Sequence, residues 1–232
     1  MVNGQKTWTT LGQHGDWIFN LVRTDPDAKK QRGISFLLID MSSSGVTVRP
    51  IEMIDGGHEV NEVWFEDVRV PKDNLVGELN SGWDYAKFLL GNERVGVAPV
   101  GATKRVLAQA KEYAGDQLAD PLVAARFAEL ENELLALELT ALRVVAHSAD
   151  GKPHPASSVL KLKGTELQQA VSELVVDLAG PASLASGDGD DSDLEGWARR
   201  ATPTYLNLRK ASIYGGSNEI QRQIISRTIL GL

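Results

Sequence analysis

The stretch from Ala211 to Leu232, ASIYGGSNEIQRQIISRTILGL, places a glycine turn directly before an apolar-periodic helix. Two adjacent glycines can adopt positive φ or approach a ligand closely, because they have no Cβ. Ser217 or Asn218 can cap the helix, and Glu219 lies in its positively polarised first turn. Such a turn can bind an anion or the polar edge of a cofactor. Taken alone, the pattern favours an ordinary capped terminal helix, so its function has to be judged from the rest of the chain.

The composition is that of an ordinary globular chain, and it excludes several classes of function. Apolar residues make up 42% and charged residues 24% of the 232 residues, enough for one large domain or two small ones. No apolar run is long enough for a membrane span, and the net charge of -7 argues against nucleic acid as a partner. The chain has no cysteine, which excludes disulfides and suits a cytoplasmic protein. Its four histidines are far apart, so no metal site is expected.

The first part of the chain, residues 1–79, has the pattern of short strands and turns. Runs rich in β-formers, separated by turn residues, cover 16–23, 34–40, 46–51 and 61–70. Short strands without helices between them indicate an antiparallel β-barrel-like domain or a sandwich. In the last run Val63, Phe65 and Val68 alternate with polar residues, which predicts a core-facing side with an irregularity near Asp67.

From residue 80 onward the pattern changes to long helices, so the fold class is α+β. The predicted helices cover 82–114, 121–148, 156–178, 194–212 and 218–230. Pro99 is expected to kink the first of them or to mark a local irregularity in it. The apolar stripe of the second helix includes Leu130, Leu134, Leu137, Ala141 and Val145. Long helices with short connections predict an all-α up-down four-helix bundle.

Three segments, in this order, resemble the acyl-CoA dehydrogenase family. NGQKTWTT at 3–10 is similar to the family's NG-x-K-x-W strand, and FEDVRVP at 65–71, with LVGE at 75–78, to its F-x-x-V-x-V-P and L-x-G element. IYGGSNEIQR at 213–222, with the final LGL, resembles its closing motif. The resemblance implies a partial middle β domain at 1–79, a C-terminal helical bundle domain at 80–232, and no N-terminal helical domain. Residues 1–232 alone are therefore expected to be inactive.

The resemblance implies FAD-dependent dehydrogenation of an acyl-CoA thioester to the 2-enoyl-CoA, with electrons passed to an electron-transfer flavoprotein in fatty acid metabolism. The reaction needs a partly desolvated carboxylate base at the α-carbon. Many members carry this glutamate directly after the closing tyrosine, where this chain has Gly215. Members of the isovaleryl type carry it on the first long helix, and LLGNERV at 89–95 resembles their segment. Glu93 is then the base and Arg94 a substrate-site residue; without the resemblance, Glu93 would be read as a surface ion-pair residue.

The resemblance also implies the contacts of the cofactor. Trp8 and Thr10 match residues that cover and hydrogen-bond the isoalloxazine ring of FAD, although a strand tryptophan more often packs at a core or rim. Gly216, Ser217 and Glu219 match positions that reach the cofactor from the closing turn.

Two departures from the family's pattern concern the diphosphate and adenine of FAD. The segment 113–121 lacks the arginine and phenylalanine of an Arg-x-x-Phe-Gly element, and Asp177 stands at the glutamine of a Gln-x-x-Gly-Gly stretch. An acidic side chain near a diphosphate is unfavourable. The segment 82–94 resembles the large subunit of pimeloyl-CoA-type dehydrogenases, so a homo- or hetero-oligomer, arranged as a dimer of dimers, is expected. The alternative is a non-catalytic or FAD-poor scaffold subunit of a heteromeric acyl-CoA dehydrogenase.

Overall fold

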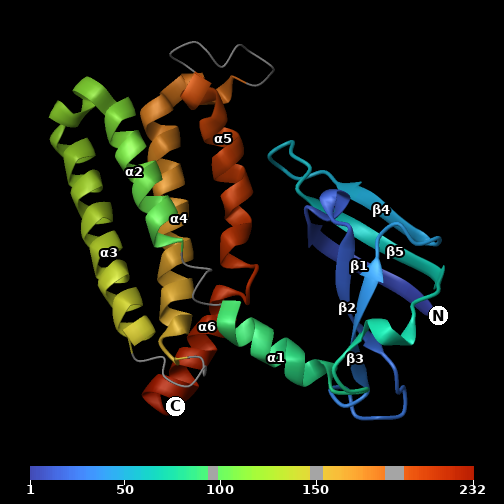
Figure 1. The fold of residues 1–232 in the computed structure, drawn as a ribbon. Coiled ribbons are helices and arrows are strands. Elements are labelled where there is room, and N and C mark those ends of the chain that lie inside the picture. The colour runs from blue at the N-terminus through green and yellow to red at the C-terminus, as the bar shows by residue number, and fades with distance from the viewer. Residues whose placement is uncertain (94–98, 147–153, 186–195) are drawn as a thin grey trace. The chain divides into compact units, whose positions relative to one another are not determined.

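The computed structural model describes residues 1–93, 99–146, 154–185 and 196–232, with the side chains of 90–93 left out (Figure 1). The chain divides into two compact units, Met1–Leu90 and Gly91–Leu232. The first unit holds the strands and the second holds the helical bundle, which confirms the predicted α+β fold class.

The first unit contains two three-stranded antiparallel sheets. One sheet has the strand order β1-β5-β4, and the other has the order β2-β3-β6. The strands are β1 (Val2–Thr10), β2 (Trp17–Arg23), β3 (Ile34–Asp40), β4 (Val46–Ile51), β5 (Val60–Val68) and β6 (Leu75–Val76). Strand β6 is only two residues long and pairs with β3 alone. Within the described residues, the sheets therefore remain separate and do not close into a barrel.

The predicted core face of β5 is confirmed. Val63, Phe65 and Val68 are buried, and Ile39 of β3 joins them in one apolar cluster. The predicted irregularity also lies where it was expected, since Asp67 has a φ of 52°. The Asp67 amide donates to Oδ1 of Asn3 at 2.7 Å, which fixes the distorted end of the β1–β5 ladder.

The change from strands to helices occurs at Asn80, which has a φ of 66°. Its backbone N–H donates to the Ser35 hydroxyl at 2.8 Å, and its side-chain oxygen accepts from Thr24 at 2.5 Å. Gly82 then starts helix α1 (Gly82–Glu93) against β3, so closely that a Cβ would lie 2.6 Å from the Ser35 carbonyl carbon. These contacts fix the start of α1 on the sheet.

Helix α1 ends at Glu93 and helix α2 (Val100–Ala114) begins directly after Pro99, so the described residues contain two helices where one was predicted over 82–114. The irregularity predicted at Pro99 is confirmed. Proline has no N–H to donate, and it favours a first turn over a helix interior. The Pro99 carbonyl accepts the amide of Thr103 at 2.9 Å and thereby opens α2.

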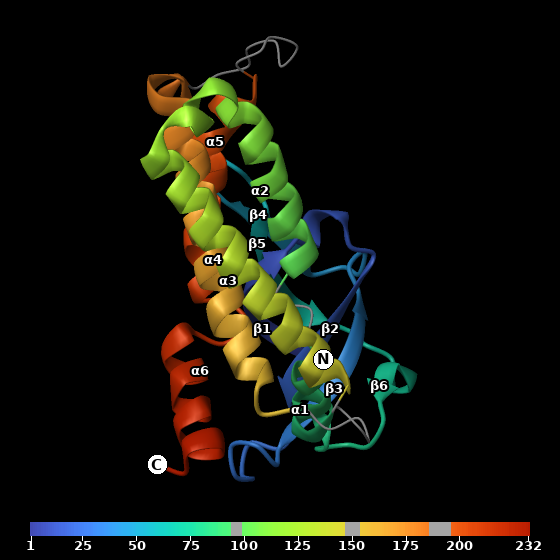
Figure 2. The same ribbon diagram turned by 90° about the vertical axis from the view of Figure 1, so that its left-hand side faces the viewer.

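The second unit is an up-down bundle in which α2, α3, α4 and α5 lie side by side (Figures 1 and 2). The remaining helices are α3 (Pro121–Ala146), α4 (Ser157–Ala179), α5 (Gly196–Leu208) and α6 (Asn218–Ile225), with a π-helical turn at Ser226–Leu230. Short 3-10 segments lie at Gly12–His14, Lys72–Asn74, Gly115–Ala119, Gly180–Leu184 and Arg209–Ser212. Helix α4 contacts α2, α3, α5 and α6, and it is the central element of the bundle.

The predicted core stripe of α3 is correct except at its end. Leu130, Leu134 and Leu137 are buried, but Val145 is 59% exposed and Val144 is buried instead. A step of three residues after Ala141 keeps the stripe on the core side, because a helix has 3.6 residues per turn.

We predict that Leu134→Ala lowers the free energy of unfolding by about 3 kcal/mol, because it leaves a cavity in the bundle core. Leu134 is 1% exposed, whereas the adjacent Leu135 is 51% exposed and provides the control. Urea unfolding of Leu135→Ala should show a loss below about 1 kcal/mol. Equal losses in the two variants would contradict the assigned core face of α3.

Candidate functional site

Trp8 lies in a β-bulge near the end of β1. Lys6 pairs with Val63 and Thr9 pairs with Asn61, so β1 has one more residue than β5 in this interval. Trp8 has a φ of 62°, and it is 65% exposed. A left-handed backbone is costly for a bulky residue and is retained mainly at functional positions. The bulge therefore marks Trp8 as a candidate site residue.

Asn61 of β5 supports the chain that follows the bulge. It is fully buried, and its side-chain nitrogen donates to the Thr9 carbonyl at 3.1 Å and to Oε1 of Gln13 at 2.6 Å. Its side-chain oxygen lies 2.7 Å from Nε2 of His58. The buried amide of Asn61 thus binds Thr9, Gln13 and His58 at once, and it holds the chain next to the bulge in place.

Trp8 and Thr10 are available to a ligand. Both are exposed, and within the described ranges neither the indole N–H of Trp8 nor the Thr10 hydroxyl has a hydrogen-bond partner. An aromatic face next to an unpaired hydroxyl suits a flat ring that carries acceptor atoms on its edge.

The glycine turn before α6 adopts the backbone conformation predicted for it. Gly215 has a φ of 64° and Gly216 a φ of 88°, both in the region that favours glycine. Both residues are exposed, and Ser217 follows them at the start of α6. The predicted cofactor positions Gly216, Ser217 and Glu219 therefore lie together on one short segment.

The cap of α6 differs from the prediction. Ser217 occupies the N-cap position, but its side chain makes no hydrogen bond to the helix amides. The Glu219 carboxylate accepts from its own backbone N–H and from the Ser217 hydroxyl, and these bonds lower the pKa of Glu219. The ionised carboxylate of Glu219 lies in the positively polarised first turn of α6, as predicted. Asn218 is buried and contacts α4 instead.

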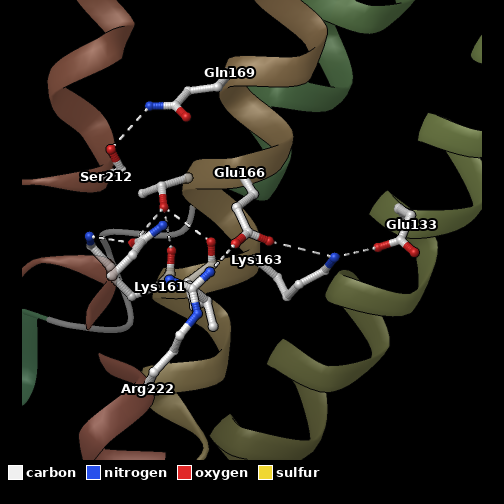
Figure 3. A network of polar contacts seen from close by, with 10 residues as sticks. Glu133, Lys161, Lys163, Glu166, Gln169, Ser212 and Arg222 are labelled. Carbon is white, nitrogen blue, oxygen red and sulfur yellow. Dashed lines mark hydrogen bonds and ion pairs between the residues drawn. The ribbon is translucent and has the colours of Figure 1, made fainter. Parts of the chain in front are cut away.

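Lys161 of α4 holds the downstream side of the turn. Its ammonium donates to Oδ1 of Asn218 at 3.0 Å, and the Thr165 hydroxyl donates to the same oxygen at 3.3 Å (Figure 3). Lys161 is fully buried, and this burial lowers the pKa of its ammonium. The negative charge of Glu219 opposes that shift in part. The start of α6 thus lies on a buried cation.

Gln169, two helical turns after Lys161, holds the upstream side. Its side-chain nitrogen donates to the carbonyls of Leu208 and Arg209 at 3.1 and 3.2 Å. The same nitrogen reaches the Ser212 hydroxyl at 3.4 Å (Figure 3). In return, the Arg209 guanidinium donates to the Gln169 carbonyl at 3.2 Å. Helix α4 therefore fixes the chain on both sides of the glycine turn.

A chain of exposed ion pairs borders this buried network. Lys163 lies 3.1 Å from Glu133 and 3.7 Å from Glu166, and Glu166 lies 3.1 Å from Arg222 of α6 (Figure 3). Exposed pairs of this kind contribute little to stability. The buried contacts of Lys161 and Gln169 are therefore the main polar links between α4 and the closing segment.

Glu93 is the last residue of α1, and its side chain lies outside the part of the chain that the structure describes. Arg94 also lies outside the described residues. Their roles stay predictions. Trp8 and Thr10 form one cluster in the first unit, and the closing-turn residues form another in the second.

The polar stripe of α4 was not predicted, although its spacing is visible in the sequence. Lys161, Thr165 and Gln169 recur every four residues, which places them on one helical face. Gln221 of α6, which is also buried, was missed as well.

Among the described residues no helix is long and apolar enough to cross a membrane, and no group of three acidic or histidine side chains could hold a metal ion.

Two family models match the chain. The model for the C-terminal domain of acyl-CoA dehydrogenase matches residues 80–230, and the model for the middle domain matches residues 1–68. The chain is 36% identical over 237 residues to acyl-CoA dehydrogenase IpdE1 of Mycobacterium tuberculosis. That match covers 100% of this chain and 59% of the relative, so the chain spans little more than half of the relative's length.

Two solved structures are similar to this chain over almost its whole length. The ChsE4-ChsE5 complex from Mycobacterium tuberculosis contains a chain that is 33% identical, with a TM-score of 0.82 and coverage of 100% of this chain and 61% of that one. The Tcur3481-Tcur3483 steroid ACAD contains a chain that is 26% identical, with a TM-score of 0.87 and coverage of 99% and 60%.

We predict that Lys161→Met changes the pH dependence of stability. Because the folded-state pKa of Lys161 is lowered from 10.5, the unfolded chain binds more protons than the folded one between the two pKa values. The stability of the wild type, relative to Lys161→Met, should therefore rise with pH through that window up to 10.5. Urea unfolding at a series of pH values measures this difference.

Lys163→Met is the matched control, since Lys163 is exposed and its ion pair with Glu133 raises its pKa. Its contribution should stay constant up to pH 10.5 and fall only above it. The same pH dependence in both variants would contradict the buried position of Lys161.

Proposed function

The chain belongs to the acyl-CoA dehydrogenase family, and on this premise we propose that it takes part in the FAD-dependent dehydrogenation of an acyl-CoA thioester to the 2-enoyl-CoA. The observation that carries the proposal is the exposed Trp8 in a strained bulge next to Thr10. This strained position falls within the segment 3–10, which resembles the family's flavin-contacting strand. Strain maintained by a buried residue, Asn61, is typical of a binding site.

The residues present fit FAD. Trp8 offers an aromatic face for the isoalloxazine ring, and Thr10 offers a hydroxyl for an acceptor atom of that ring. From the closing turn, Gly216, Ser217 and Glu219 would contact the cofactor. Bound FAD would supply the acceptor, its N5 atom, for the hydride that leaves the β-carbon.

Glu93 is the proposed base. Its carboxylate would take the α-proton of the thioester, and the electrons of that C–H bond would form the new double bond as the hydride leaves the β-carbon. Gly215 cannot perform this step, because it has no side chain. Arg94 would help to set the charge around Glu93 and the substrate.

The proposed partners are an electron-transfer flavoprotein, which would take the electrons, and a second dehydrogenase subunit. Support for the second subunit comes from two similar structures, the ChsE4-ChsE5 complex and the Tcur3481-Tcur3483 steroid ACAD, which are both named as pairs. We therefore favour assembly with a related chain, as a dimer of dimers, over a homo-oligomer.

A second candidate function is that of an FAD-poor scaffold subunit in such an assembly. Asp177, which stands where relatives carry a glutamine, accepts a 2.6 Å hydrogen bond from Arg126 of α3. The pair gives Asp177 a partner within its own chain, and its carboxylate is unfavourable for a diphosphate. This observation favours a weakened cofactor site on that side of the chain.

We predict that Glu93→Gln retains flavin but lowers kcat for acyl-CoA oxidation by at least about 100-fold, because the base is lost. The measurement is a dye-coupled assay on the purified assembly with the proposed partner subunit, because residues 1–232 alone are expected to be inactive. Flavin content is determined from the absorption spectrum. Glu129→Gln, which changes an exposed glutamate on α3, is the control and should keep full activity. Full activity in flavin-loaded Glu93→Gln would show that another residue is the base.

We also predict that Trp8→Leu weakens FAD binding by roughly fivefold, because stacking on an aromatic ring contributes about 1 kcal/mol. Trp17→Leu is the control, since Trp17 is also on a strand of the first unit and is 56% exposed. Flavin fluorescence titration measures both dissociation constants. Equal effects in the two variants would contradict a specific role for Trp8, and a wild type without flavin would favour the scaffold function.

A further inference from the structure

Gln221 of α6 lies directly beneath the glycine turn. It is 1% exposed, and its side-chain nitrogen donates to the carbonyl oxygens of Gly215 and Gly216 at 3.4 and 3.2 Å. The approach is close, because a Cβ on Gly216 would lie 2.7 Å from that nitrogen. The side chain therefore fills the inner side of the turn and binds two consecutive peptide groups.

The orientation of the Gln221 amide is fixed by these two carbonyls. If the amide were reversed, its oxygen would face two other oxygen acceptors, which would repel it. In the present orientation the oxygen of Gln221 is buried and has no hydrogen-bond partner among the described residues. An unpaired buried acceptor costs stability, so its presence calls for an explanation.

The two carbonyls determine where the neighbouring N–H groups point. The described chain contains no cis peptide bond, and in a trans peptide the carbonyl oxygen and the following N–H point in opposite directions. Since the carbonyls of Gly215 and Gly216 face Gln221, the N–H groups of Gly216 and Ser217 face away from it. Neither N–H has an acceptor in the described part of the chain.

The charges around these two N–H groups indicate what they can bind. The N-terminus of α6 and the ammonium of Lys161 make the position electropositive. The carboxylate of Glu219 lies at the same helix start and is ionised, which disfavours a phosphate or another full negative charge. An uncharged carbonyl oxygen with a partial negative charge satisfies both conditions.

We propose that Gln221 is a positioning residue, which holds the two glycine carbonyls inward so that the N–H groups of Gly216 and Ser217 form an outward-facing donor pair for an uncharged carbonyl oxygen. That oxygen would come from the flavin ring or from the thioester of the substrate. The identity of the ligand rests on the proposed function, whereas the arrangement of the turn does not.

The unliganded protein tests the arrangement of the turn. Backbone order parameters from NMR relaxation should be near 0.85 for Gly216 and Ser217 in the wild type and below about 0.6 in Gln221→Met, because the turn loses its inner support. Gln223→Met, on the exposed side of the same helix, should leave both values unchanged. Unchanged order parameters in Gln221→Met would overturn the proposal.

Gly216→Ala provides a second route if Gln221→Met does not fold. The added methyl group would displace the Gln221 nitrogen, and it would also be strained at a φ of 88°. The turn amides should then show the same loss of order, while the amides of α3 retain wild-type values. A rigid turn in Gly216→Ala would contradict the role of Gln221.

Titration with FAD, and then with an acyl-CoA, tests the ligand. The N–H signals of Gly216 and Ser217 should shift on binding, and Gln221→Met should raise the dissociation constant roughly three- to tenfold, as expected for lost hydrogen bonds. Shifts with FAD alone would identify the flavin oxygen, and shifts only after acyl-CoA would identify the thioester. Affinities within twofold of the wild type would overturn the donor role.

Failure of the dehydrogenase function and failure of the positioning role of Gln221 would give different results. If neither FAD nor acyl-CoA shifts these signals in the wild type, the dehydrogenase function fails for this chain. The order parameters of Gln221→Met, Gly216→Ala and Gln223→Met would still decide whether Gln221 positions the turn.

Discussion

The hydrogen bond from the buried ammonium of Lys161 to Asn218 connects the closing segment to the bundle. A lysine without contact with water is tolerated only where acceptors are held in place, since the charge otherwise costs several kcal/mol. Helix α6 has eight residues, and a helix of that length is not stable alone in water. Its position is therefore set by α4, and Lys161 makes that position specific.

The same face of α4 sets the conformation of the turn. With Gln169 bound to the end of α5 and Lys161 bound to the start of α6, the chain between them has to turn within a few residues and then continue along α4. Two adjacent glycines with positive φ make this turn possible without Cβ strain. The first unit uses a related device, because the buried Asn61 fixes the chain around the strained Trp8. In both units, a buried amide or ammonium supports an exposed, unusual backbone.

Much of this fold could be predicted from the sequence, because strands and helices follow from the local pattern. The core face of β5 and the positive φ of the glycine turn depend on such local signals. The place of Val144 in the core also follows from helical periodicity, although Val145 was predicted there, and Pro99 marks the expected irregularity before α2. The partners of Lys161 and Gln169 lie about forty to sixty residues away in the sequence, so their role became clear only from the fold. The exposure of Trp8 depends on an extra residue in the ladder, which the alternation of residue types does not reveal.

The geometry of the turn bears on where a catalytic carboxylate can lie. Gly215 has a φ of 64°, and a glutamate there would be strained by about 1 kcal/mol or more in the same conformation. This strain disfavours a side chain at position 215 as long as Gln221 keeps the carbonyls inward. The proposed base, Glu93, is the last residue of α1 and makes no such demand on the backbone of the turn.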